Sequence, residues 1–172
     1  GFFMLTQRVM GAPMTLVASA IGDVFRQEAS YAYVNTGNCK DIYIRTFKRL
    51  LYISILPSIA FFFIAPDLFS LIFSEKWRVA GEYAQILTPV LLLRFITSPL
   101  SVMFMIAEKQ KLDLIWQIVL LATTSAAFFI GYLYASEKTA LIFYSLSYSL
   151  LFVINFFMTL NFASGKVAKV AN

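Results

Sequence analysis

Long apolar segments recur along this chain, and they constrain its fold more than any other feature. A segment of about 20 apolar residues has the length at which an α-helix crosses the hydrocarbon core of a bilayer. Hydrophobic residues make up 60% of the 172 residues and charged residues only 13%, whereas a soluble domain carries about 25% charged residues. The sequence therefore predicts an all-α, polytopic membrane protein built as a helical bundle.

Five transmembrane spans are predicted, at residues 2–25, 50–73, 80–107, 114–135 and 140–160. The second and third contain prolines, which membrane helices tolerate because neighbouring helices and water satisfy the carbonyls that proline leaves free. Residues 26–49 are predicted to be a cytoplasmic or interfacial connection, with a turn signal at Asn35–Asn38. The part after that turn has the spacing of an amphipathic helix lying among the headgroups. A longer first helix followed by a soluble loop fits equally well.

The basic residues are distributed unequally between the two sides of this arrangement. Nine of the 14 Lys and Arg residues fall after spans one, three and five, against three in the other two connections. Cytoplasmic loops carry the excess of Lys and Arg, so these nine are placed in the cytoplasm. The basic residues lie between apolar spans and form no continuous soluble face, so membrane lipids are expected as partners and nucleic acid is not.

The scarcity of reactive side chains excludes several chemistries. The chain has a single Cys, Cys39, and no His, so neither a disulfide framework, nor a Cys/His zinc site, nor His catalysis is expected. No catalytic residue, metal ion or cofactor is predicted, and the protein is not expected to be an enzyme. The sequence starts at Gly1 directly in an apolar run, without a charged n-region, and we expect it to be a fragment of a longer chain.

Arg94 lies in the middle of an apolar stretch, LTPVLLLRFITSPL. A charge near the bilayer midplane costs roughly 2.5 to 3.5 kcal/mol on insertion scales, and it usually faces a protein interior or a watery cavity. Arg94 either lines a cavity that binds an anion, because its planar guanidinium donates two parallel hydrogen bonds to oxyanions, or is neutralised by a carboxylate on a helix outside this sequence. Gln7 and Arg8 in span one are weaker candidates, and Arg8 can simply reach the interface.

Polar residues also form stripes on two of the predicted helices. Span five carries four of them on one helical face: Tyr144, Tyr148, Asn155 and Thr159. Such a stripe either bonds to another helix or lines a hydrophilic passage. Gln117 and Thr124 form a shorter stripe in span four, where Gly131 and Ala135 are small enough for close contact between helices.

Three stretches resemble the polysaccharide or O-antigen flippases (Wzx-type proteins) of the multidrug/oligosaccharidyl-lipid/polysaccharide exporter superfamily. They are residues 1–30, residues 66–89, with the sequence PDLFSLIFSEKWRVAGEYAQILTP, and residues 94–117, with the sequence RFITSPLSVMFMIAEKQKLDLIWQ. The last two are the most specific. Ser74 departs from the pattern, since members of this family usually have Gly before the Glu and Trp of this turn.

The resemblance implies a transporter of 12 to 14 helices in two lobes, of which this chain is part of the C-terminal lobe and the N-terminal lobe of the same chain is a partner. Such a protein moves a polyprenyl-diphosphate-linked oligosaccharide across the bacterial cytoplasmic (inner) membrane for O-antigen, capsule or exopolysaccharide synthesis. The substrate-binding residues that follow from this hypothesis are Arg94, Arg8, Gln7, Tyr144, Tyr148 and Asn155.

Two other functions remain open from the sequence. A cation-coupled multidrug exporter of the same superfamily is expected to have a buried acidic residue for ion coupling, and spans two to five have none near their centres. A membrane-bound polysaccharide polymerase or ligase needs a large polar periplasmic loop with catalytic residues. The predicted periplasmic connections are short.

Overall fold

The computed structural model describes the backbone of residues 2–134 and 136–165, and the side chains of residues 15–134 and 136–165. Within these residues all regular secondary structure is helical, as predicted. The elements are α1 (Phe2–Thr36), α2 (Lys40–Phe73), η1 (Glu75–Trp77), α3 (Arg78–Leu100), α4 (Met103–Ile106), α5 (Gln110–Leu133) and α6 (Glu137–Ala163).

Four segments of the described chain are long and apolar enough to cross a membrane: α2, the stretch Glu75–Ile106 that contains α3, α5 and α6. The chain is therefore a multi-pass membrane protein. The last two predicted spans agree with α5 and α6 to within a few residues at each end, and the third corresponds to α3, a turn and the short helix α4. Helix α3 runs without a break through Pro89 and ends at Leu100, directly after Pro99.

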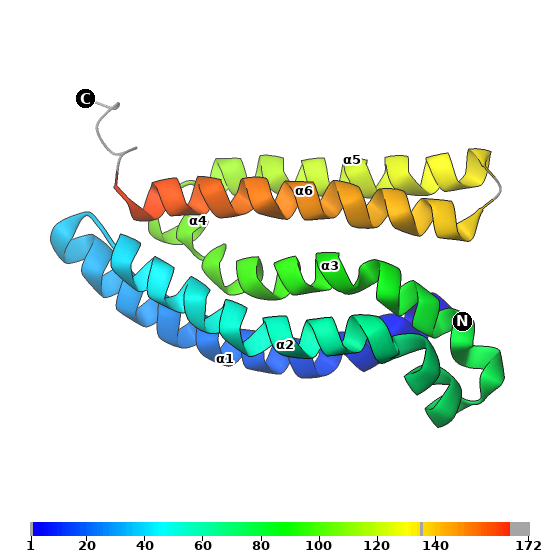
Figure 1. The fold of residues 1–172 in the computed structure, drawn as a ribbon. Helices are drawn as coiled ribbons and strands as arrows, with labels where there is room; N and C mark the ends of the chain where they lie inside the picture. The colour runs from blue at the N-terminus through cyan, green and yellow to red at the C-terminus, as the bar shows by residue number, and fades with distance from the viewer. Residues whose placement is uncertain (1, 135, 166–172) are drawn as a thin grey trace.

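Helix α3 is the central element of the bundle. It lies between the pair α1 and α2 on one side and the pair α5 and α6 on the other (Figure 1), and it packs against α1, α2 and α6. In the segment that contains α3, half of the residues of the most apolar stretch are buried. The corresponding share is 17% to 22% in the other three membrane-spanning segments. The other three spans therefore leave most of their apolar surface free for lipid.

Residues 26–49, predicted to connect the first two spans, form no element of their own and are divided between the end of α1 and the beginning of α2. Helix α1 continues to Thr36, and only three residues separate it from α2, which begins at Lys40. Gly37 takes a left-handed conformation (φ 68°), which suits a residue that ends a helix. The Asn38 side-chain oxygen accepts a hydrogen bond from the Lys40 N–H at 2.8 Å. This bond satisfies one of the N–H groups in the first turn of α2 that have no partner within the helix. The turn signal at residues 35–38 thus marks the α1–α2 turn. The first helix is longer than the predicted span, and the helix after the turn is continuous with the second span and follows without a loop.

Residues 40–49 are continuous with the rest of α2 because the buried side of the helix extends through them. Tyr43, Thr46 and Leu50 are buried at helical spacing, and no helix-breaking residue lies between Lys40 and Leu50. Packing on that side therefore favours one long helix over a bend at the membrane surface.

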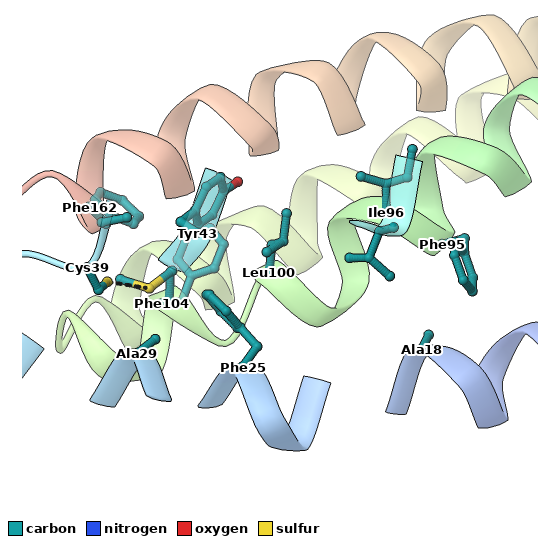
Figure 2. Close-up of a cluster of buried hydrophobic side chains, with 13 residues drawn as sticks. Ala18, Phe25, Ala29, Cys39, Tyr43, Phe95, Ile96, Leu100, Phe104 and Phe162 are labelled. Atoms are coloured by element: carbon teal, nitrogen blue, oxygen red, sulfur yellow. Dashed lines mark hydrogen bonds between the residues drawn. The ribbon is translucent and has the colours of Figure 1, made fainter. Parts of the chain in front are cut away.

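The larger apolar core joins α1, α2, α3, α4 and the end of α6. Figure 2 shows Phe25 of α1, Tyr43 of α2, Phe104 of α4 and Phe162 of α6 converging on this core. The Tyr43 hydroxyl is 2.8 Å from the Thr159 hydroxyl and 3.2 Å from the Phe156 carbonyl oxygen. A buried Tyr needs such a partner, and α6 provides it.

Cys39 lies in the turn and is 2% exposed. Its backbone N–H donates to the Ala163 carbonyl oxygen at 2.9 Å, and its thiol lies 3.6 Å from the Met103 sulfur (Figure 2). Burial raises the pKa of the Cys39 thiol to about 11. The α1–α2 turn is therefore held against α4 and the end of α6 without any covalent bond.

Two glycines allow helices to approach closely. A Cβ atom on Gly131 would lie 2.2 Å from the Cβ of Ala140 on α6, which confirms the predicted close contact at this position; its predicted partner Ala135 lies outside the described residues. A Cβ on Gly81 would lie 2.5 Å from the Ala65 carbonyl oxygen of α2. At Gly81 backbone meets backbone, so neither side can move aside cheaply.

We expect Gly81→Ala to lower the free energy of unfolding by about 1 to 3 kcal/mol, because an added methyl group must push α3 away from α2. The measurement is unfolding of the purified chain in mixed detergent micelles. Ala126→Val, which adds methyl groups at an exposed position of α5, is the control and should change stability little. Equal stability of Gly81→Ala and the unmodified chain would contradict the close contact.

Cys39 should react slowly with maleimide in the folded protein. With a pKa of about 11, only about one thiol in 10⁴ is ionised at pH 7, and the rate should rise roughly tenfold per pH unit from 7 to 9. Labelling rates at several pH values, before and after unfolding in dodecyl sulfate, test this. Asn35→Cys in a Cys39→Ala background gives an exposed thiol beside the same turn as the control. If Cys39 labels as fast as this control at pH 7, its burial is wrong.

Candidate functional site

A polar cavity of about 460 Å³ lies between α3, α5 and α6. The residues that line it are Arg94, Ser98, Ser101, Asp113, Trp116, Gln117, Leu120, Leu121, Thr124, Tyr144, Tyr148, Phe152 and Asn155. Helix α3 packs extensively against α6 but not against α5, and this leaves space between the three helices.

Helix α3 supplies Arg94 and Ser98, and Ser101 follows directly as its C-cap residue. The three share one face at spacings of four and three residues. Arg94 is exposed, and it forms no ion pair with any described residue. The Ser101 hydroxyl donates to the Thr97 carbonyl oxygen at 2.9 Å and lies 3.2 Å from the side-chain oxygen of Asn155. The α3 wall thus presents a cation and two hydroxyls.

Helix α6 supplies Tyr144, Tyr148 and Asn155. The rings of the two tyrosines lie 4.4 Å apart between centroids and are tilted by 33°. Asn155 is only 2% exposed and lies deep in the wall. The Tyr148 hydroxyl is hydrogen-bonded to the Thr124 hydroxyl and donates to the Leu120 carbonyl oxygen of α5 at 2.9 Å. These bonds join α5 to α6 along the cavity.

Helix α5 supplies Asp113, Gln117 and Thr124. The Gln117 side-chain nitrogen donates to an Asp113 carboxylate oxygen at 3.4 Å. Asp113 lies in the first turn of α5, so its negative charge is close to the favourable N-terminal end of the helix dipole. The cavity therefore contains both a carboxylate and a guanidinium.

Hydrogen bonds and an ion pair join α3 to α6 beyond the cavity, toward the α2–α3 and α5–α6 turns. Lys138 pairs with Glu82 at 2.5 Å, and the Tyr83 hydroxyl donates to a Glu137 carboxylate oxygen at 2.6 Å. The Ser145 hydroxyl donates to the Ile86 carbonyl oxygen at 2.8 Å. The distribution of basic residues predicts that this is the non-cytoplasmic end, and the cavity then lies on the cytoplasmic side of these bonds.

Four of the six residues predicted to bind substrate line this one cavity: Arg94, Tyr144, Tyr148 and Asn155. The side chains of Gln7 and Arg8 lie outside the described residues. Thr159, the last member of the α6 stripe, is fully buried and bonds to Tyr43 instead. The α6 stripe therefore divides into a part that lines the cavity and a part that packs. Gln117 and Thr124 of the shorter stripe line the cavity as well.

Three polar residues of the cavity were not singled out from the sequence: Ser98, Ser101 and Asp113. The two serines follow Arg94 at helical spacing, and this signal was available in the sequence. Asp113 precedes Gln117 by four residues, but the predicted span began at residue 114 and left it outside. Because α5 begins at Gln110, Asp113 is on the helix and on the face that lines the cavity.

No protein-family model, curated protein or solved structure matches this chain. Among the described residues, no group of three His, Cys, Asp or Glu side chains is placed to hold a metal ion. The fold and the polar cavity are therefore the observations from which a function is argued.

We expect position 94 to be accessible to water in the folded protein. In a Cys39→Ala background, Arg94→Cys should react with a membrane-impermeant methanethiosulfonate at least about tenfold faster than Leu150→Cys, because a thiol ionises in water and not in hydrocarbon. Leu150 is on α6 and is 64% exposed, but it does not line the cavity. Equal labelling of the two variants in membranes would show that the cavity is dry.

Proposed function

We propose that this chain forms part of a flippase that moves a polyprenyl-diphosphate-linked oligosaccharide across the bacterial cytoplasmic membrane. The observation that carries the proposal is Arg94, a cation without an ion-pair partner among the described residues, in a cavity with Tyr144, Tyr148 and Asn155. A helix in a membrane keeps such a charge only where it meets another polar group or water. The resemblance of residues 66–89 and 94–117 to polysaccharide flippases supports the same function.

The chemistry of the cavity suits a substrate that carries phosphate and sugars. A guanidinium donates two parallel hydrogen bonds to a phosphate and stays charged. Gln117 and Ser98 offer groups that can bond to sugar hydroxyls, and the tyrosine rings offer apolar faces to sugar C–H groups. A polar headgroup in this cavity is shielded from hydrocarbon, while a polyprenyl tail can remain in lipid.

Transport would follow from movement of helices around this fixed site. In alternating access, one group of helices rocks against another while the binding site stays near the midplane. The bonds between α3 and α6 beyond the cavity, through Glu82, Tyr83 and Ile86, would keep the non-cytoplasmic side closed while the substrate enters. The N-terminal lobe of a longer chain would supply the facing wall.

A second candidate function is a cation-coupled exporter, and Asp113 is the observation that favours it. Ion coupling needs an acidic residue in the transport pathway, and Asp113 lines the cavity. A polymerase or ligase has less support, because the described non-cytoplasmic connections are only a turn with η1 and the short α5–α6 link.

We expect Arg94→Ala to slow translocation of a fluorescent polyprenyl-diphosphate oligosaccharide at least about tenfold, since hydrogen bonds to a charged group contribute roughly 1.5 to 3 kcal/mol. Arg94→Lys keeps the charge and loses the planar fork, so its translocation rate should lie between those of Arg94→Ala and the unmodified protein. The assay uses the full chain in proteoliposomes. A second measurement is the amount of lipid-linked precursor in cells, which should accumulate in the Arg94→Ala variant.

The control is Arg26→Ala, because Arg26 is exposed and pairs locally with Asp23 at 3.4 Å. Its rate should equal that of the unmodified protein. Translocation at the unmodified rate by Arg94→Ala would rule out the proposed role of Arg94. If Asp113→Asn instead abolished cation-driven export of drugs and left the lipid-linked substrate unaffected, the exporter would be the better assignment.

A further inference from the structure

Three basic residues and a tyrosine share one exposed face at the beginning of α2. Arg45, Lys48, Arg49 and Tyr52 follow one another at spacings of three, one and three residues, which places them on the same side of the helix. All four are exposed, and Tyr52 is 75% exposed. We call these four residues the basic face of α2.

The basic face has no protein partner among the described residues. None of its three cations forms an ion pair with any of them. Asp41, four residues before Arg45 on the same helix, forms none either, although that spacing allows one. The packed side of the helix is a different one, formed by Tyr43, Thr46 and Leu50. Three like charges are therefore held together on the surface without compensation.

The length of α2 places this face at the membrane surface. Its 34 residues span roughly 51 Å at 1.5 Å per residue, whereas the hydrocarbon core is about 30 Å thick. The apolar part from Leu50 to Phe73 alone spans about 36 Å. The basic turns before Leu50 therefore project into the headgroup region, on the side that carries most Lys and Arg.

Further along α2, toward the membrane interior, the same face becomes apolar. Leu56, Ile59 and Phe63 continue it at helical spacing and are 73%, 51% and 71% exposed. Tyr52 lies between the two parts, at the level where membrane proteins place Tyr and Trp. From the cytoplasmic side inward the face thus offers cations, an amphipathic ring and a hydrocarbon surface.

We propose that the basic face of α2 is a binding site for an anionic phospholipid of the cytoplasmic leaflet. Arg45, Lys48 and Arg49 contact the phosphate headgroup, and the acyl chains lie along Leu56, Ile59 and Phe63. Charge complementarity identifies the headgroup, and the apolar continuation of the face identifies a lipid as its source. A nucleic acid or an acidic protein would leave that apolar part without a partner. The proposal does not depend on the proposed transport function.

The test measures binding of phosphatidylglycerol to the full chain in zwitterionic detergent, by native mass spectrometry and by the shift in thermal unfolding. Each basic residue near an anionic surface contributes about fivefold in affinity. The triple variant R45Q/K48Q/R49Q should therefore bind phosphatidylglycerol at least about tenfold more weakly, with phosphatidylcholine binding unchanged. Inorganic phosphate at the same concentration should neither stabilise the protein nor compete.

The matched control is K109Q/K111Q, which removes two cations from the same predicted side but from the beginning of α5. It should leave phosphatidylglycerol binding nearly unchanged. An equal loss in both variants would indicate a diffuse surface charge and overturn the site, as would full competition by inorganic phosphate or unchanged binding by the triple variant. If the triple variant does not fold, the three single Gln variants replace it, and unchanged affinity in all three overturns the proposal.

Discussion

The burial of α3 against three other helices is the interaction on which the rest of the bundle depends. Gly81 brings its backbone onto α2, and the Ser145 hydroxyl bonds to its Ile86 carbonyl oxygen from α6. Helices in lipid gain little from apolar burial alone, so close backbone approach and hydrogen bonds between helices hold them together. Helix α3 has both kinds of contact. It has no extensive contact with α5, and the polar cavity lies between these two helices and α6.

The helical class and the spans α5 and α6 could be predicted because a stretch of about 20 apolar residues has few alternatives in a membrane. The continuity of α2 from Lys40 into the second span could not. Its first ten residues are rich in charge, and charge indicates where a membrane ends, not where a helix ends. Helix continuity there depends on the burial of Thr46 and on the bond between Tyr43 and the distant Thr159, which the local sequence does not reveal.

The candidate site could likewise be predicted only in part. Arg94 stood out because its charge is costly wherever the helix lies, and the α6 stripe stood out because of its spacing. Whether a polar residue of such a stripe faces a cavity or a neighbour is decided by tertiary packing. Asn155 and Thr159 are four residues apart, yet one lines the cavity and the other is enclosed by Tyr43. Asp113 was missed because the helix begins before its apolar part does.

The bond between Tyr43 and Thr159 has a consequence for the order in which the protein is made. The two residues are 116 positions apart, and a ribosome adds about 5 to 20 residues per second. The Tyr43 hydroxyl is therefore synthesised roughly 6 to 23 seconds before its partner exists. During biosynthesis α2 must hold this hydroxyl near water or bond it elsewhere, and the α1–α2 end of the bundle can reach its final packing only after α6 has been inserted.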